Sequence, residues 1–154
     1  MGQIIVRSPG VMKGYLSRPE ATATVLRDGW YRSGDLGYLD EEGYLTWTGR
    51  VDDVIVRWTG TNVSPAELEN VLTTHPHVAQ AAVVGVQEPG VGRKVAAVIV
   101  LKPGASADEL TLRSWLCKEI PENQMPDLFR FRSSLPMTAT GKVARHLVAA
   151  DAAL

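Results

Sequence analysis

Val78-Ala-Gln-Ala-Ala-Val-Val-Gly-Val86 and Lys94-Val-Ala-Ala-Val-Ile-Val-Leu101 form the most continuously apolar part of this 154-residue chain. Each stretch has the length of a buried strand. The segment that joins them is short and contains two glycines, Gly90 and Gly92. We therefore expect two adjacent buried strands connected by a glycine-rich loop.

Helical patterns flank these two strands. Ser64-Pro65-Ala66-Glu67 places a capping serine before a proline at the first helical position, and the predicted helix ends at His75-Pro76. Downstream, Ser106-Ala-Asp-Glu109 is interpreted as a second capping box, and Phe129-Arg-Phe-Arg132 alternates as a half-exposed strand does. A short terminal helix is expected from about Val143. These elements predict an α+β domain of about 100 residues.

The first fifty residues are predicted to be mostly β-structure. A strand is expected at residues 3–7, and a β-hairpin is expected around the acidic loop Asp40-Glu-Glu-Gly43. Gly49-Arg-Val-Asp-Asp53 is a polar break before the next apolar run. We place a domain boundary there, which divides the chain into residues 1–51 and 52–154.

Composition excludes several classes of protein. The chain has 16 Lys and Arg residues and 17 Asp and Glu residues, which gives a net charge of −1. This balance argues against general electrostatic binding to nucleic acid. No apolar run approaches the roughly 20 residues that span a bilayer. The single cysteine, Cys117, excludes an intramolecular disulfide, and the three histidines lack the spacing of zinc ligands. We expect a cytoplasmic protein whose own residues form no metal site.

Three other segments carry the functional information, and they carry it as a set. Their order is Tyr31-Arg-Ser-Gly-Asp-Leu36, then Gly49-Arg-Val-Asp-Asp-Val-Ile55 leading into Gly60-Thr-Asn-Val-Ser-Pro-Ala-Glu-Leu-Glu69, and finally Leu135-Pro-Met-Thr-Ala-Thr-Gly-Lys142 with Arg145. In this order and at these separations they resemble the adenylate-forming superfamily, which includes acyl- and aryl-CoA synthetases, peptide-synthetase adenylation domains and beetle luciferases. The resemblance covers nearly the whole chain.

The resemblance implies a fold and a set of cofactors. Residues 1–51 would be the β-rich end of the family's large N-terminal domain, and residues 52–154 its small mobile C-terminal domain, with a mixed sheet and packing helices. The family's phosphate loop and magnesium-binding glutamate belong to the missing part of the N-terminal domain. We therefore expect a piece of a longer enzyme, inactive alone. The full-length enzyme would use ATP, Mg²⁺ and CoA, and none of these is expected to bind tightly to this piece.

Lys142 is the predicted catalytic residue. Joining a carboxylate to the α-phosphate of ATP brings two anions together, and the developing charge requires a positioned cation. A lysine beside a glycine suits this task, because its ammonium group is a mobile point charge and glycine allows close approach. Spacing alone favours a solvated surface lysine. The resemblance instead identifies Lys142 as the lysine that enters the active site for adenylation.

Three residues are predicted to contact the nucleotide. A carboxylate such as Asp35 accepts paired hydrogen bonds from vicinal ribose hydroxyls, and the resemblance assigns Asp35 that role. It also places Arg50 near the ribose and phosphate, and Tyr31 in the same site. Without the resemblance, Asp35 would be interpreted as a turn residue, Arg50 as a surface ion-pair partner and Tyr31 as a core aromatic.

The resemblance further implies a rotation that alternates two catalytic poses. Asp52 matches the hinge position between the two family domains. Gly60, with Thr59, matches the loop that lines the pantetheine path when the thiol enters. The ordinary interpretations are a loop carboxylate and a turn glycine. Trp58, next to this loop, is expected to pack on a neighbour rather than to cover the thiol entrance.

Three functions are considered, the first two for a longer enzyme and the third for this chain folding independently. The first is an acid:CoA ligase, whose partners are a carboxylic acid substrate and CoA; the segment Val63–Glu69 and Thr140-Gly141-Lys142 resemble the ligases in particular. The second is an adenylating enzyme that loads an acyl or aminoacyl group onto a carrier protein. The third is a noncatalytic interaction module.

Overall fold

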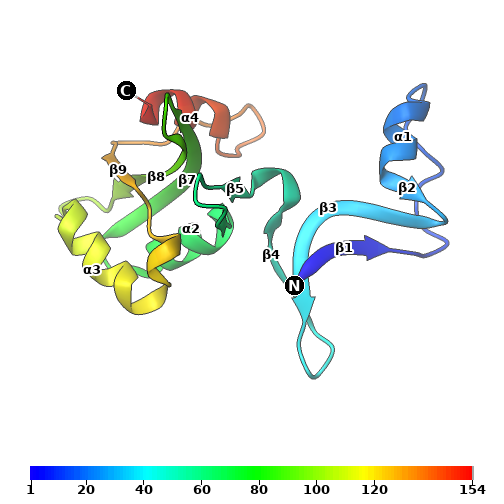
Figure 1. The fold of residues 1–154 in the computed structure, drawn as a ribbon, viewed down its shortest axis with the longest axis horizontal. Helices are drawn as coiled ribbons and strands as arrows, with labels where there is room; N and C mark the ends of the chain where they lie inside the picture. The colour runs from blue at the N-terminus through cyan, green and yellow to red at the C-terminus, as the bar shows by residue number, and fades with distance from the viewer. Residues whose placement is uncertain (154) are drawn as a thin grey trace. The chain divides into compact units, whose positions relative to one another are not determined.

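A computed structural model of the chain describes residues 1–153. The chain has two compact units, Met1–Asp53 and a second unit that begins at Val54 (Figure 1). No helix among the described residues is long and apolar enough to cross a bilayer. The assignment of the chain to two enzyme domains, divided after residue 51, stays a prediction.

The first unit is built on strand β3, which pairs antiparallel with each of the other strands of its sheet. Its elements are β1 (Gly2–Val6), α1 (Pro19–Val25), β2 (Leu26–Arg27), β3 (Trp30–Leu39), β4 (Leu45–Arg50) and the 3-10 helix η1 (Val51–Asp53). The β3–β4 hairpin confirms the one expected around residues 40–43. Its loop is closed by the Asp40 carboxylate, which accepts hydrogen bonds from the amides of Glu42 and Tyr44.

The second unit centres on a mixed sheet in the order β7-β8-β9. Strands β7 (Val78–Glu88) and β8 (Gly92–Leu101) are antiparallel, whereas β9 (Leu128–Phe131) runs parallel to β8. The unit also contains a separate antiparallel pair of short strands, β5 (Ile55–Val56) and β6 (Asn62–Val63). Its helices are α2 (Pro65–Thr74), α3 (Glu109–Glu119), the 3-10 helix η2 (Glu122–Gln124) and α4 (Arg145–Ala152). The predicted α+β class, with a mixed sheet and packing helices, is confirmed.

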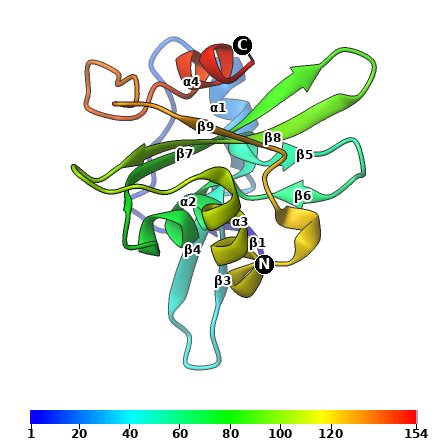
Figure 2. The ribbon, with the colours of Figure 1, turned by 90° about the vertical axis from the view of Figure 1, so that its left-hand side faces the viewer.

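Both faces of the mixed sheet are buried under helices. Successive side chains of a strand point to opposite faces, so each strand contributes to both cores. On β8, Val95, Ala97 and Ile99 belong to the core that includes α2 and α3. The alternate residues Ala96 and Val98 belong to a second core that includes α4. Figure 2 shows α2 and α3 on one side of this sheet and α4 on the other. Burial of both faces explains why β7 and β8 are almost continuously apolar.

Two predicted helix starts are wrong by two residues. The cap of α3 is Asp108 and not Ser106, because Asp108 Oδ1 accepts hydrogen bonds from the amide of Thr111 at 2.8 Å and from its hydroxyl at 2.6 Å. These bonds lower the pKa of Asp108. The terminal helix begins at Arg145 because Val143 forms a β-bridge with Met137. Tertiary pairing therefore holds Val143 in extended backbone.

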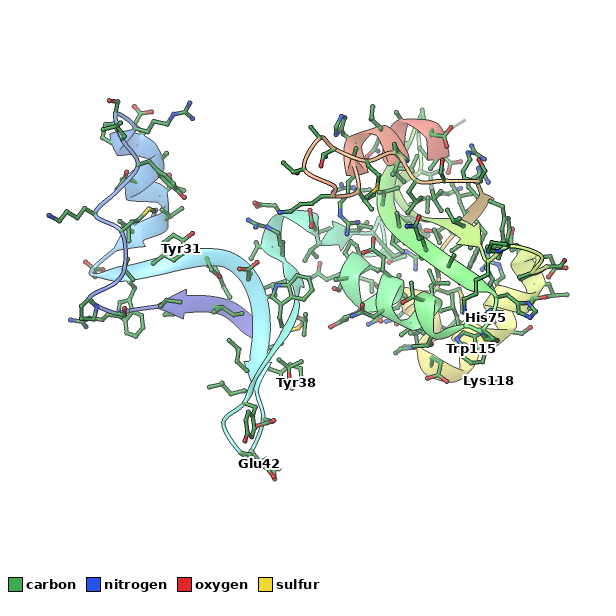
Figure 3. The ribbon with its side chains drawn as sticks, turned by 180° about the vertical axis from the view of Figure 1, so that it is seen from behind. Tyr31, Tyr38, Glu42, His75, Trp115 and Lys118 are labelled. Atoms are coloured by element: carbon green, nitrogen blue, oxygen red, sulfur yellow. The ribbon has the colours of Figure 1, made fainter. Side chains whose placement is uncertain are left out.

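His75 ends α2 and is buried, with 5% of its surface exposed. Its ring lies edge-on to Trp115 with 5.0 Å between the centroids, and both are labelled in Figure 3. The His75 Nδ1 accepts a hydrogen bond from the amide of His77 at 3.2 Å. Burial first, and then the charges of His77 and Lys102, lower the pKa of His75. The folded chain therefore favours the neutral ring.

We expect the free energy of unfolding to fall as the pH is lowered from about 7.5 to about 5.5. The unfolded chain takes up the proton near the ordinary pKa of about 6.5, before folded His75 does. The stability that depends on a neutral His75 is therefore fully present above that pH and is lost below it. Urea unfolding at the two pH values measures the loss, which His75→Gln should reduce. His146→Gln, at an exposed position on α4, should leave the loss unchanged, and an undiminished loss in His75→Gln would contradict the assignment.

Candidate functional site

Three of the predicted site residues meet in one cleft of the first unit. Tyr31 from β3, Arg50 from the end of β4 and Asp52 from η1 line this cleft, whose volume is about 420 Å³. They meet because β3 and β4 are paired and η1 follows β4 directly. The β3–β4 pair and η1 thus place these three residues together, and residues of β1, α1 and β2 also line the cleft.

Asp35 lies opposite Arg50 in the register of β3 and β4. Arg50 Nη1 is 4.0 Å from Asp35 Oδ1, and Trp47 Nε1 donates to the same oxygen at 3.4 Å. The side chains of Arg50 and Asp35 are 51% and 33% exposed, so their ion pair adds little to stability and both stay accessible to a ligand. A Cβ at Gly34, where φ is +78°, would lie 3.0 Å from Arg50 Nη2, so glycine leaves room for the guanidinium group.

Ser33 holds the backbone beside Asp35. Its hydroxyl donates to the carbonyl oxygen of Ile4 at 2.9 Å and accepts from the amide of Asp35 at 3.0 Å. The neighbouring Tyr15, and then partial burial, raise the pKa of Tyr31. A phenol keeps its proton at neutral pH even at its ordinary pKa of about 10, so Tyr31 can donate a hydrogen bond. Figure 3 labels Tyr31 on β3. A phenol, a guanidinium group and carboxylates can together bind hydroxyl groups and phosphate oxygens.

Lys142 lies at the end of a hydrogen-bonded loop in the second unit. The Thr138 amide donates to the Lys142 carbonyl oxygen at 2.7 Å, and the Lys142 amide donates to Thr138 Oγ1 at 3.1 Å. Gly141 adopts a φ of +78°, which favours glycine, and its amide donates to the Thr138 carbonyl oxygen at 3.0 Å. Lys142 is exposed, and within residues 1–153 no carboxylate forms an ion pair with it. The loop presents its ammonium group to solvent on an ordered backbone.

Gly60 and Thr59 lie in the turn between β5 and β6. Gly60 has a φ of +82°, and apart from Gly60 and its two chain neighbours no heavy atom of the described residues lies within 4 Å of the position that its Cβ would take. The adjacent Trp58 is 63% exposed. A Cβ added to Gly92 would lie 2.8 Å from Trp58 Cβ, so the base of this side chain packs on Gly92 at the start of β8. The expectation that Trp58 packs on a neighbour is therefore met at the base of its side chain, while most of the residue's surface stays exposed.

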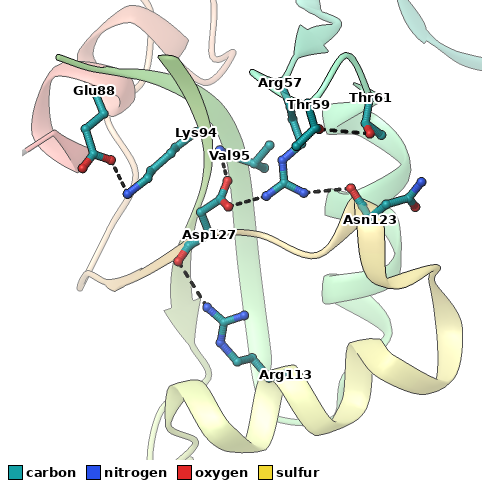
Figure 4. A network of polar contacts seen from close by, with 9 residues as sticks. All are labelled: Arg57, Thr59, Thr61, Glu88, Lys94, Val95, Arg113, Asn123 and Asp127. Carbon is teal, nitrogen blue, oxygen red and sulfur yellow. Dashed lines mark hydrogen bonds and ion pairs between the residues drawn. The ribbon is translucent and has the colours of Figure 1, made fainter. Parts of the chain in front are cut away.

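Arg57 attaches this turn to the rest of the second unit (Figure 4). Its Nη1 donates to the Asn123 carbonyl oxygen at 2.7 Å, and its Nη2 pairs with Asp127 Oδ1. Asp127 Oδ2 accepts from the Val95 amide at 2.7 Å, and Arg113 Nη2 donates to the Asp127 carbonyl oxygen at 3.2 Å. Arg57 thus bonds the β5–β6 turn to η2, and Asp127 joins Arg57 to β8 and α3.

Glu69, Arg57 and Asp127 carry interactions that the sequence analysis did not predict. Glu69 on α2 forms a two-pronged ion pair with Arg145 at the start of α4, with distances of 2.7 and 2.8 Å. Glu69 and Arg145 are 76 residues apart in the sequence. Arg57 and Asp127 are 70 residues apart. Local periodicity in the sequence cannot predict contacts between residues so far apart. The available signal was that Glu69 and Arg145 stand inside the segments that carry the family resemblance.

Known proteins match this chain along nearly its whole length. Residues 67–142 match the family model of the AMP-binding enzyme C-terminal domain. The long-chain-fatty-acid–CoA ligase of Bacillus subtilis (strain 168) is 43% identical over 145 residues, which are 94% of this chain and 26% of that protein.

Two solved structures share the fold. The amide bond synthetase McbA from Marinactinospora thermotolerans is 41% identical, with a TM-score of 0.88 over 97% of this chain and 30% of that one. The o-succinylbenzoate CoA synthetase of Bacillus subtilis, in complex with its acyl-adenylate intermediate, is 35% identical, with a TM-score of 0.86 over 96% of this chain and 30% of that one. The chain thus spans less than a third of the length of each of these relatives.

Proposed function

We propose a function from one premise: this chain belongs to the adenylate-forming superfamily, and it carries that superfamily's AMP-binding enzyme C-terminal domain. On this premise it acts as part of a longer acid:CoA ligase, which converts a carboxylic acid to an acyl-adenylate and then to an acyl-CoA. The observation that carries the proposal is Lys142, an exposed lysine on an ordered loop within the matched segment 67–142. The N-terminal domain of the longer enzyme would supply the rest of the active site.

In the first half-reaction, a carboxylate oxygen of the acid attacks the α-phosphorus of ATP, and pyrophosphate leaves. Charge spreads over the phosphate oxygens as this happens, so a cation aimed at them lowers the barrier. Lys142 is proposed to supply that cation. The hydrogen bonds from Thr138 already order the backbone that bears it, so fewer degrees of freedom have to be lost at the reacting centre.

The cleft of the first unit is proposed as the nucleotide-binding part of this chain. The exposed carboxylate of Asp35 would accept hydrogen bonds from the two ribose hydroxyls. Arg50 would pair with phosphate, and the protonated phenol of Tyr31 would donate a hydrogen bond. Asp52 lines the same cleft and is proposed as the hinge for the rotation between the two half-reactions.

In the second half-reaction, the thiol of CoA attacks the acyl carbon. A carbon–sulfur bond forms, the carbon–oxygen bond to phosphate breaks, and AMP leaves with its electron pair. Gly60 and Thr59 are proposed to border the path of the pantetheine chain. The open space beside Gly60 supports this assignment, since a side chain at that position would occupy it and would strain the backbone at a φ of +82°.

Mg²⁺ is proposed for the longer enzyme only. Within residues 1–153, no group of three or more His, Cys, Asp or Glu side chains could hold a metal ion, so the residues described here are assigned no part in binding it.

A cytoplasmic location is also proposed, because the thiol of Cys117 is free and exposed and would persist best in a reducing compartment.

The test is an assay of the full-length protein for CoA-dependent release of AMP over a panel of fatty, aromatic and short-chain carboxylic acids. We expect at least one acid to yield acyl-CoA and AMP in equal amounts. Reactions that lack the acid or CoA are the controls. Failure of every acid to form either an adenylate or a thioester would contradict the proposal.

A different acceptor is the second candidate, favoured by the likeness to an amide bond synthetase. The first half-reaction would be the same, but an amine or the phosphopantetheine thiol of a carrier protein would attack the acyl-adenylate. Offering each acceptor in turn to the preformed adenylate separates the candidates. The ligase requires CoA to consume the adenylate fastest, whereas a noncatalytic module requires that no acceptor consume it.

A further inference from the structure

We propose that Glu69 is a positioning residue for Lys142 and that it acts through Arg145. The inference rests on the proposed role of Lys142 in adenylation. It adds to that role a carboxylate on α2, which precedes Lys142 by more than seventy residues in the sequence. The contacts that support it all lie within the second unit.

Glu69 and Arg145 form a closed set of hydrogen bonds with one residue of the sheet. Arg145 Nη1 donates to Glu69 Oε1 at 2.7 Å, and Arg145 Nη2 donates to Glu69 Oε2 at 2.8 Å. Glu69 Oε1 also accepts from the Val83 amide at 2.8 Å, while Arg145 Nη1 donates to the Val83 carbonyl oxygen at 2.9 Å. A two-pronged, charge-assisted contact of this kind fixes orientation as well as distance.

Val83 is on β7, which is an edge strand of the sheet β7-β8-β9. Its amide and carbonyl groups are bonded by Glu69 and Arg145, which here take the place of a further strand. Glu69 is 19% exposed and Arg145 is 34% exposed, so the contact is only partly screened by solvent. The pair therefore joins α2, β7 and the start of α4 at one point.

Few freely rotating residues separate Arg145 from Lys142. Val143 forms a β-bridge with Met137, and the Ala144 amide donates to the Pro136 carbonyl oxygen at 2.8 Å. Lys142 itself is hydrogen-bonded to Thr138 on the other side of the loop. A shift of Arg145 would consequently be transmitted to the backbone that carries the lysine.

Helix α4 is weakly held at its start by its own bonds. Its N-cap is Ala144, which makes no side-chain capping bond, and the helix has only 8 residues. Short helices without a capping side chain are weakly held by their own bonds. Burial of Ala144 and Val148 fixes the depth of the helix, and the Glu69–Arg145 pair fixes its direction at the end nearest Lys142.

Amide hydrogen exchange on this chain tests the structural half of the inference without any catalysis. In Glu69→Gln, which keeps the shape of the side chain but removes its charge, we expect the amides of Lys142 and Ala144 to exchange about tenfold faster, because charge-assisted bonds are about twice as strong as neutral ones. The control is Asp151→Asn, which breaks the exposed ion pair of Arg132 with α4. Unchanged exchange in Glu69→Gln would overturn the inference.

Half-reaction kinetics on the full-length enzyme test the functional half. We expect Glu69→Gln to slow adenylation about tenfold through kcat, with KM for the acid unchanged, and to leave thioester formation from preformed acyl-adenylate at the wild-type rate. Arg145→Lys keeps the charge but loses the two-pronged contact, so it should fall between Glu69→Gln and wild type. A purely stabilising role for Glu69 would slow both half-reactions equally or neither, and either result overturns the inference.

The two proposals fail separately. If Lys142→Ala leaves adenylation intact, the proposed function of Lys142 fails whatever Glu69 does. If Lys142→Ala abolishes adenylation while Glu69→Gln matches Asp151→Asn in both measurements, the positioning role alone fails. Urea unfolding of each variant identifies any general loss of the fold.

Discussion

Lys142→Ala in the full-length enzyme is expected to lower the rate of acyl-adenylate formation by about 100- to 1,000-fold. Removing one preorganised group that stabilises developing charge has an effect of this size. The side chain is exposed on a loop closed by backbone bonds, so its loss should not disturb the fold. Pyrophosphate exchange in the presence of the acid and ATP measures the first half-reaction alone.

The matched control for this variant is Lys118→Ala, at an exposed lysine in the last turn of α3. It should leave pyrophosphate exchange unchanged. Thioester formation from preformed acyl-adenylate should persist in Lys142→Ala, because the lysine is proposed to act only in the first half-reaction. Equal loss of both half-reactions would show that Lys142 is structural.

Leu72→Ala is expected to lower the free energy of unfolding of the second unit by about 2–5 kcal/mol. Leu72 is on α2, has 0% of its surface exposed and lies in the core that α2 and α3 form with the sheet. Truncation removes buried apolar contacts and leaves a cavity that close-packed neighbours fill only in part. Urea unfolding followed by helical circular dichroism measures the change, since α2, α3 and α4 all belong to this unit.

Leu110→Ala is the control for packing, because Leu110 is also helical, on α3, but is 70% exposed. It should change the free energy of unfolding by at most about 0.5 kcal/mol. The slope of the free energy with urea should be the same for both variants, since the same surface is exposed on unfolding. Similar losses for Leu72→Ala and Leu110→Ala would contradict the assignment of Leu72 to the core.

Sequence patterns predicted the regular elements of the second unit because their signals are local. The apolar runs of β7 and β8 and the Ser64-Pro65 start of α2 each depend on neighbours within a few residues. Patterns failed where a distant partner competes with a local signal. Because Val143 pairs with Met137, α4 begins two residues later than its local pattern predicts. Strand β6 forms because Val63 pairs with Ile55.

Family motifs named the candidate site residues, and the structure describes their surroundings. It brings Tyr31, Arg50 and Asp52 into one cleft and sets Asp35 opposite Arg50. Their catalytic and binding roles stay predictions. Local motifs could not show that the Ser33 hydroxyl is bonded to Ile4, because that contact depends on the register of β1 and β3.

The amino-acid sequence by itself carried the resemblance to the adenylate-forming superfamily and predicted the α+β class and the loop that presents Lys142, since each depends on residue types at short spacing. Only the tertiary structure decided that Glu69 meets Arg145 at Val83, and that Asp127 joins Arg57 to β8. The physical reason is that these ion pairs lie between elements far apart in the chain. Side chains become neighbours across such distances only after apolar burial has brought the helices and strands together.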